Sequence, residues 1–210
     1  MPRWRTPAET CTSKPETYRV AFAEETGRAA RAPLSSPGEG RPQCPNFEIM
    51  AIADYRNDDG GRQGIGLEGL VVKLAEREED LEAAIALRFQ VFVGEQSIAP
   101  EEELDEADAA ATHAVALHQG KVVGTGRLVG TDATTVQIGR MAVDAAWRRR
   151  GIGGRILEFL EETARAQGAR LGVLHAQEYV KEFYAARGYR EHGETFLEVN
   201  IPHVEMRKEL

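Results

Sequence analysis

The sequence predicts an α/β domain over residues 67–210, in an α+β, three-layer arrangement of helices packed on a mixed, mostly antiparallel central sheet. Two observations lead to this fold class. Short apolar, β-branched segments alternate with segments whose apolar residues recur at helical spacing. A polar turn at residues 119–121 joins two of the strands directly, and so short a connection makes them antiparallel neighbours.

The first half of this domain begins with a strand at residues 69–74. An amphipathic helix is expected at 80–91, because its apolar side chains fall on one face, and a polar loop follows it. Strands at 113–118 and 122–128 flank the hairpin turn, and a second turn leads to a long strand at 135–143. These last three strands are expected to be antiparallel.

The second half again alternates helices and strands, and a glycine ends each predicted helix. No internal repeat is visible. The expected elements are a helix at 153–167 ending near Gly168, a strand at 171–175, a helix at 179–186 ending at Gly188, and strands at 189–192, 194–198 and 203–208.

Residues 1–66 differ in composition from the rest of the chain. Proline, glycine, arginine and acidic residues are mixed there without lasting periodicity, which predicts a mostly disordered extension. Within it, residues 16–31 favour a short helix and residues 47–52 favour packing on the domain. Both cysteines, Cys11 and Cys44, fall in this extension, so neither a disulfide framework nor a zinc site is expected.

Charge and hydropathy exclude two classes of partner. The chain has no apolar run long enough to span a membrane and no apolar N-terminal leader, which predicts a cytoplasmic protein. The formal charge of −8 arises in residues 67–210, which carry 17 basic and 25 acidic side chains, so nucleic acid is not expected as a partner. The acids concentrate at 101–108, where they either steer a cationic amine towards a site or form a solvated loop.

A strand, a turn, a basic glycine-rich loop and a helix start follow one another at residues 136–154. Gly151, Gly153 and Gly154 allow a ligand to approach the backbone closely. The first turn of a helix has unpaired N–H groups and the positive end of the helix dipole. Arginines at 148–150 add cationic partners for phosphate oxygens. The segment is therefore predicted to hold a pyrophosphate.

The amino-acid sequence of this loop excludes two common phosphate-binding motifs. A P-loop needs Lys directly after its last glycine, whereas here Gly154 follows Gly153. A dinucleotide-binding loop needs a third glycine where this chain has Ile156. The remaining pattern is Arg148-x-x-Gly151-x-Gly153, for which a glycine-rich turn beside solvated arginines is the structural alternative.

That pattern, placed after a strand and opening a helix, resembles the coenzyme A loop of the GNAT acyltransferase superfamily of N-acetyltransferases. Two positions depart from the pattern of the superfamily: Asn200 stands where a glycine is expected in a turn, and Tyr189 replaces a phenylalanine. The resemblance covers about residues 68–210. Segments that resemble the bacterial ElaA-like branch are 87–96 (LRFQVFVGEQ), 124–127 (GTGR), 138–143 (IGRMAV), 183–188 (FYxxxG) and 196–206 (FxExxIxHxxM).

The resemblance implies a GNAT-like sheet whose fourth and fifth strands splay apart, with acetyl-CoA as the acyl-donor cosubstrate between them and no metal. Backbone groups of Met141, Ala142 and Val143 would meet the pantetheine arm, a role compatible with buried side chains. An exposed N–H near Val143 would stabilise the oxyanion. The residues implied for the pyrophosphate are Arg148, Arg149, Arg150, Gly151, Ile152, Gly153 and Gly154.

Acyl transfer to an amine needs an acid for the leaving thiolate and a base for the amine. The resemblance implies that Tyr184 protonates the coenzyme A sulfur; packing is its alternative role. The base is expected among Glu95, His175, Glu198 and His203, each of which also has a structural explanation. Glu95 and Gln96 are expected to line the acceptor pocket, and His175 to end the fifth strand and face the cleft. Glu198 is expected to pair with His203, as an acid–imidazole pair or a strand-end salt bridge.

Three arginines, Arg88, Arg127 and Arg140, are expected either to orient these catalytic groups through ion pairs or to be solvated. The predicted function is transfer of an acetyl group from acetyl-CoA to an amine of a small molecule or protein, by direct attack in a ternary complex. A non-catalytic acyl-CoA-binding or interaction module and an enzyme like the acyl-homoserine-lactone synthases are the alternatives. A homodimer is compatible with each of these functions.

Overall fold

Residues 67–210 are described from a computed structural model. The expectations for the N-terminal extension, including the helix at 16–31, the segment at 47–52 and both cysteines, fall outside the described residues.

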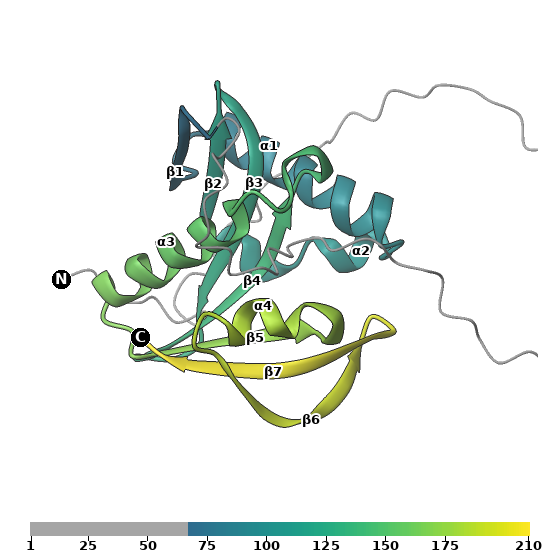
Figure 1. The fold of residues 1–210 in the computed structure, drawn as a ribbon, viewed down its shortest axis with the longest axis vertical. Coiled ribbons are helices and arrows are strands. Elements are labelled where there is room, and N and C mark those ends of the chain that lie inside the picture. Colours follow the sequence, from purple (N-terminus) through teal and green to yellow (C-terminus); the bar gives the residue numbers. More distant parts are fainter. Residues whose placement is uncertain (1–66) are drawn as a thin grey trace, which may run out of the picture. The chain divides into compact units, whose positions relative to one another are not determined.

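Within residues 67–210, seven strands form the central sheet. They are β1 (Leu70–Leu74), β2 (Thr112–His118), β3 (Lys121–Gly130), β4 (Thr135–Val143), β5 (Leu171–Gln177), β6 (Arg190–Glu198) and β7 (Ile201–Glu209). Their order across the sheet is β1-β2-β3-β4-β5-β7-β6 (Figure 1). Only β4 and β5 are parallel, and all other neighbours are antiparallel. The predicted mixed, mostly antiparallel sheet is confirmed.

The connections contain both long and very short helices. They are α1 (Glu78–Arg88), the π-helix η1 (Phe89–Glu95), α2 (Pro100–Glu103), η2 (Glu106–Ala109), η3 (Ala145–Trp147), α3 (Ile152–Ala166), η4 (Glu178–Val180) and α4 (Lys181–Ala185). The predicted end of the helix at residue 91 is therefore wrong. The α-helix ends at Arg88, and the chain continues directly as the π-helix η1 to Glu95. The predicted polar loop after it contains α2 and η2.

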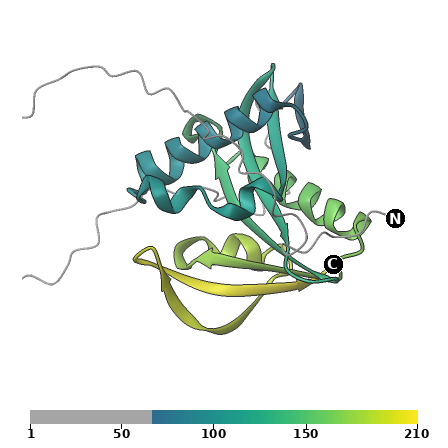
Figure 2. The same cartoon turned by 180° about the vertical axis from the view of Figure 1, so that it is seen from behind.

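The sheet separates two apolar cores, because side chains of a strand point alternately to its two faces. On β2, Ala114 and Ala116 belong to the core that α3 and α4 cover, whereas Val115 packs with Leu87 and Val91. Figures 1 and 2, seen from opposite sides, place α3 on one face of β2 and β3 and α1 on the other.

Two glycines let α3 lie close to β3. A Cβ atom at Gly124 would lie 2.7 Å from Cδ1 of Ile156, and one at Gly126 would lie 2.6 Å from the sulfur of Met141. Both glycines belong to the GTGR segment. That segment therefore has a packing role, which is to bring the helix after the glycine loop against the sheet.

β4 and β5 pair only at their beginnings, between residues 135–137 and 171–173. Beyond these pairs the two strands diverge, as Figure 1 shows. Arg140 marks a bulge in β4, since its φ is 51° and the register with β3 shifts beside it. The predicted splay of the fourth and fifth strands is confirmed.

β6 and β7 form a hairpin at one edge of the sheet. The strands expected at 189–192 and 194–198 are a single strand, whose register shifts around Gly193, where φ is 84°. Val199 and Asn200 form the turn, with φ values of 50° and 61°. Asparagine tolerates this left-handed backbone, so its replacement of a glycine leaves the turn intact.

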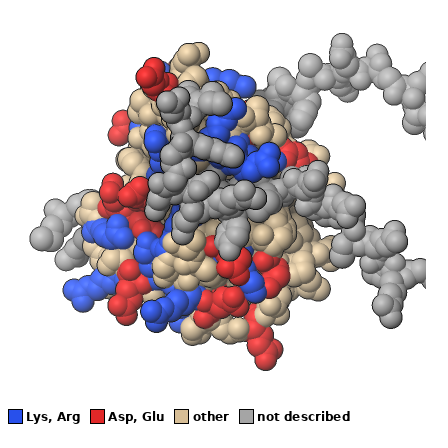
Figure 3. Space-filling view, in the orientation of Figure 1, with Lys and Arg blue, Asp and Glu red and all other residues tan. Residues whose placement is uncertain are grey.

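The charged side chains of the domain are mixed in sign. On the face shown in Figure 3, acidic and basic residues lie interspersed over the described part of the surface. In residues 67–210, every helix is too short or too polar to cross a membrane.

Candidate active site

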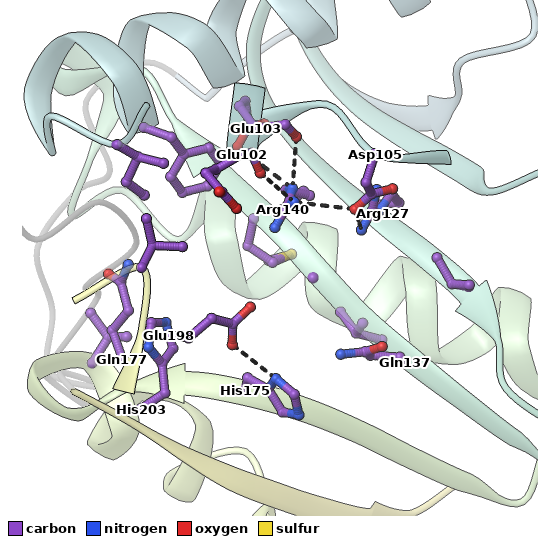
Figure 4. A pocket seen from close by; sticks show the side chains of 18 of the residues that line it. Glu102, Glu103, Asp105, Arg127, Gln137, Arg140, His175, Gln177, Glu198 and His203 are labelled. Atoms are coloured by element: carbon purple, nitrogen blue, oxygen red, sulfur yellow. Dashed lines mark hydrogen bonds and ion pairs between the residues drawn. The ribbon is translucent and has the colours of Figure 1, made fainter. Parts of the chain in front are cut away.

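A cavity of about 320 Å³ opens where β4 and β5 diverge (Figure 4). Its walls come from η1 and α2 on one side, from the bulged part of β4, and from β5, α4 and the β6–β7 turn on the other. The residues of its wall that carry polar or ionisable groups are Glu102, Glu103, Asp105, Arg127, Gln137, Arg140, His175, Gln177, Tyr184, Glu198 and His203.

The acidic segment is held to the wall of this cavity by arginines. Arg88, which is 1% exposed, places Nε 2.5 Å from Glu103 Oε1 and Nη1 2.7 Å from Asp108 Oδ1. Arg127 bonds both carboxylate oxygens of Asp105, at 2.7 and 2.9 Å. Arg140 lies 3.2 Å from Asp105 Oδ2. The segment is therefore not a solvated loop. The three arginines are ion-paired, but with acids of this segment and not with the side chains expected to supply the base.

These six side chains form a closed ring of charges, called here the arginine–carboxylate ring: Arg88, Glu103, Arg140, Asp105, Arg127 and Asp108. Two further contacts complete it, Arg140 Nε to Glu103 Oε2 at 3.5 Å and Arg127 Nη1 to Asp108 Oδ1 at 2.9 Å. Each arginine faces two acids and each acid two arginines, so the ring has no net charge.

Burial opposes the charge on the acids of this ring. It raises the pKa of Glu103 above its usual range, despite the attraction of Arg88. Burial alone would also raise the pKa of Asp108, but hydrogen bonds and charges from Arg88 and Arg127 hold it well below its usual range. Removal of one member of so enclosed an ion pair is expected to destabilise the fold, because it leaves its partner charged and buried.

His175 and Glu198 face each other in the cavity. His175 Nδ1 lies 3.0 Å from Glu198 Oε2, and Figure 4 shows the contact. This hydrogen bond with Glu198 raises the pKa of His175, and the bond with His175 lowers the pKa of Glu198. The expected pair of Glu198 with His203 is wrong, because His203 Nδ1 instead lies 2.8 Å from the carbonyl oxygen of Ile201. β5 continues to Gln177, so His175 lies within the strand.

Tyr184 lines the same cavity from α4. Its side chain is buried, and among residues 67–210 no hydrogen-bond partner of its hydroxyl is found. Its ring packs edge-on against Phe183 and Tyr189, with centroids 4.9 and 6.0 Å away. Burial raises the pKa of Tyr184 above its ordinary value, so the phenol keeps its proton at neutral pH.

Neither Glu95 nor Gln96, both expected to line the acceptor pocket, lines this cavity. Glu95 Oε2 lies 2.6 Å from Arg148 Nη2, while Arg148 Nε donates to the carbonyl of Val143 at 2.9 Å. The reason is that η1 carries the end of the helical segment towards the glycine loop. Of the three consecutive arginines, only Arg149 and Arg150 are exposed, and Arg150 lies over the ring of Trp147 at 5.0 Å.

The glycine loop offers an open helix N-terminus. Gly151, at φ 81°, is the N-cap of α3 and has no side chain to cap it. The first helical hydrogen bond runs from the N–H of Arg155 to the carbonyl of Gly151, at 3.1 Å. The N–H groups of Ile152, Gly153 and Gly154 therefore have no helical acceptor, and their donor set suits a phosphate.

The strand residues Met141, Ala142 and Val143 are buried, with exposed fractions of at most 3%. Their side chains belong to the two cores, so only their backbone groups are available to a ligand. This part of β4 lies beyond the last pair with β5, which ends at Gln137. The edge of β4 that faces β5 is therefore open along the bulge.

A pair of glutamines, Gln96 and Gln177, bridges the two sides of the splay, and only Gln96 was among the residues singled out from the sequence. Gln96, just after η1, accepts a hydrogen bond from Gln177 Nε2 at 3.1 Å and donates to the hydroxyl of Tyr179 at 3.1 Å. Gln177 is the last residue of β5 and lines the cavity. The one available signal was a polar residue at the end of an apolar strand.

Comparison with known proteins gives the family. The profile described as "Acetyltransferase (GNAT) domain" matches residues 72–210. The uncharacterized N-acetyltransferase YjcF of Bacillus subtilis is 38% identical over 137 residues, covering 65% of this chain and 97% of the relative.

Solved structures have the same fold. The structure of Escherichia coli ElaA is similar with a TM-score of 0.61 and 26% identity, over 67% of this chain and 99% of that chain. A GNAT family acetyltransferase from Elizabethkingia anophelis with acetyl-CoA bound is similar with a TM-score of 0.53 and 16% identity, over 68% of this chain and 99% of that one. The resemblance to ElaA is confirmed, and the chain belongs to the GNAT acetyltransferase family.

Proposed function

We propose that this protein transfers an acetyl group from acetyl-CoA to an amine bound in the cavity at the β4–β5 splay. The observation that carries the proposal is that one cavity is lined both by the His175–Glu198 pair and by the hydroxyl-bearing side chain of Tyr184. A proton acceptor and a proton donor are the two groups that acyl transfer to an amine requires. We place this activity in residues 67–210.

The glycine loop fits the phosphates of acetyl-CoA. Its donors would be the first-turn amides of α3, with Arg149 and Arg150 exposed beside them. The fold neighbour from Elizabethkingia anophelis, which has acetyl-CoA bound, supports the choice of this cosubstrate. Bound there, acetyl-CoA would supply an activated acetyl thioester.

The His175–Glu198 pair is proposed as the base. An ionised Glu198 accepts the hydrogen bond of Nδ1–H, which leaves Nε2 of the neutral ring as the atom that can take a proton from the amine. The raised pKa of His175 makes it a stronger base than an isolated histidine. Glu198 thus positions and polarises the imidazole.

Tyr184 is proposed as the acid. Its phenol is protonated at neutral pH and is not engaged by another described residue. When the new C–N bond forms and the C–S bond breaks, the amine loses a proton to His175 and the sulfur gains one from Tyr184. The two proton transfers balance, and the enzyme is restored when His175 returns a proton to Tyr184 through solvent.

A broad screen of amines with acetyl-CoA tests the proposal, read out as release of free thiol and as mass gain of the amine. We expect at least one amine class to be acetylated and the rate to depend on Tyr184. If acetyl-CoA binds but no acceptor releases coenzyme A, the protein is an acyl-CoA-binding module and the proposal fails. Release of thiol only with acyl-carrier substrates and homoserine-like acceptors would point to lactone synthesis instead.

A further inference from the structure

The cavity has an excess of negative charge that the arginine–carboxylate ring does not neutralise. The arginine–carboxylate ring contributes Arg127, Arg140, Glu103 and Asp105 to the wall, and every one of these charges faces an opposite charge within the ring. Two more carboxylates line the cavity outside the ring, those of Glu102 and Glu198. With neutral histidines, the lining therefore keeps a net charge of minus two.

The two remaining carboxylates lie on opposite walls. Figure 4 shows Glu102 extending from α2 on one side and Glu198, with His175, on the other. They belong to segments almost a hundred residues apart in the chain. The fold, and not a single acidic segment, therefore brings both carboxylates to this cavity.

Glu102 differs from every other carboxylate of the lining. Glu103 and Asp105 are paired with arginines, and Glu198 is bonded to His175. The carboxylate of Glu102 has neither an ion pair nor a hydrogen bond to any residue within 67–210. It is exposed, faces the cavity, and is open to a cationic ligand.

We propose that the acceptor is a small aliphatic amine with two amino groups, of the α,ω-diamine class. This inference rests on the proposed function, because it takes the end at His175 as the reacting end. The reacting nitrogen attacks in its neutral form, after its first proton has gone to solvent, and gives a second proton to the His175–Glu198 pair as the C–N bond forms. The other nitrogen stays protonated and binds Glu102. A monoamine would leave Glu102 without a partner. A volume of about 320 Å³ suits a small acceptor of this kind.

The chemistry of diamines favours this arrangement. Two ammonium groups on one short chain repel each other, so the first proton leaves more readily than from a monoamine. Glu102 holds the second charge away from the reacting end. The net negative charge of the cavity favours binding of the cationic diamine but opposes loss of a proton from it, so deprotonation depends on the repulsion within the diamine and on the His175–Glu198 pair.

The test uses the full chain and pairs of ligands with equal numbers of carbons, n-alkylamines and α,ω-diamines of three to six carbons. Binding is measured by calorimetry and acetylation by thiol release. We expect diamines to bind at least about tenfold more tightly than the matched monoamines, with an optimum chain length. Glu102→Gln should remove this preference, because it weakens the binding of diamines far more than that of monoamines.

Glu101→Gln is the matched control, since Glu101 is an exposed neighbour on α2 that does not line the cavity. It removes the same charge and should keep the diamine preference. Glu102→Lys should in turn favour ω-amino acids over diamines, because the carboxylate of such a ligand would pair with the new ammonium. Circular dichroism of each variant checks that the fold is kept.

The outcomes separate this inference from the proposed function. Equal affinity for monoamines and diamines, or a preference that survives Glu102→Gln, overturns the assignment of Glu102 even when amines are acetylated. Diamine binding that depends on Glu102 without any acetylation supports the assignment and overturns the proposed function. Neither binding nor acetylation of any amine overturns both.

Discussion

Arg148 ties the end of η1 to the glycine loop, with its Nη2 2.6 Å from Glu95 Oε2 and its Nε bonded to the carbonyl of Val143 at 2.9 Å. Both side chains are largely shielded, with exposed fractions of 12% and 21%. The first arginine of the Arg-x-x-Gly-x-Gly pattern thus shapes the loop from inside. The amides and the exposed side chains of Arg149 and Arg150 are therefore the groups that we propose for phosphate contacts.

Glu95→Gln should weaken the binding of coenzyme A roughly three- to tenfold, because a neutral amide holds Arg148 less firmly. The rate at saturating acetyl-CoA should change little, since Glu95 lies outside the cavity. Calorimetric titration with coenzyme A and steady-state kinetics measure the two effects. Glu82→Gln, which removes an exposed charge from α1, is the control. Tighter binding in the variant would mean that Glu95 competes with the phosphates for Arg148.

Gly151→Glu should reduce coenzyme A affinity about a hundredfold or more, because it places bulk and negative charge at the helix N-terminus expected to hold the phosphates. Gly120→Glu is the matched control. Gly120 has nearly the same φ, 80° against 81°, and a Cβ there meets no atom within 4 Å. Both variants carry the strain of a left-handed side chain, so equal affinities in the two would remove the loop from the binding site.

Tyr184→Phe should lower kcat roughly a hundredfold and spare coenzyme A affinity, because it removes only the proton donor. Tyr189→Phe makes the same atomic change at a second buried tyrosine, whose hydroxyl lies outside the cavity. Its turnover should match that of the unchanged protein. A full rate in Tyr184→Phe would reduce Tyr184 to a packing residue.

Local pattern was sufficient for most of the fold. α3 was predictable because its apolar residues lie on one face, and most strands because short runs are rich in apolar and β-branched residues. Gly168 and Gly188 adopt the left-handed conformation that ends a helix. The π-helix η1 was not predictable. Its apolar residues, Phe89, Val91, Phe92 and Val93, span only five positions, which is too short a run to distinguish one helical period from another.

The polar part of the site depends on contacts that no local pattern encodes. The acids at 101–108 look solvated because their arginine partners lie on α1, β3 and β4. His175 and Glu198 meet although β7 lies between their strands in the sheet. Proximity of Glu198 and His203 in sequence favoured the wrong pair, since the hairpin turn directs His203 to the carbonyl of Ile201.

Glu198→Gln should shift the acidic limb of the pH–rate profile to lower pH. In the unchanged protein, the bond to Glu198 raises the pKa of His175 above its ordinary 6.5, and activity requires the neutral ring. Removing the carboxylate removes that rise. As pH rises, kcat/KM for one amine should therefore reach its plateau at a lower pH than in the unchanged protein, and the plateau value should be lower. Glu194→Gln, on the same strand outside the cavity, should keep the original midpoint.

The same pair should affect stability with a defined sign. The raised pKa of His175 stabilises the fold below 6.5, and this stabilisation is lost as pH rises through the folded-state value. The lowered pKa of Glu198 stabilises it above 4.5, and this is lost as pH falls through the folded-state value. The urea-denaturation midpoints of the unchanged protein and of Glu198→Gln should thus differ most between pH 4.5 and pH 6.5.

Glu103→Ala should destabilise the domain by about 3–5 kcal/mol, because it leaves Arg88 buried with one of its two acids missing. Glu101→Ala, an exposed change on the same helix, should stay within about 0.5 kcal/mol. The free energy of unfolding from urea titration measures both. The double variant Arg88→Met with Glu103→Leu should be less destabilised than the sum of its single changes, because it removes both buried charges together. Additive losses would show that the two side chains act as separate packing residues and not as members of one ring.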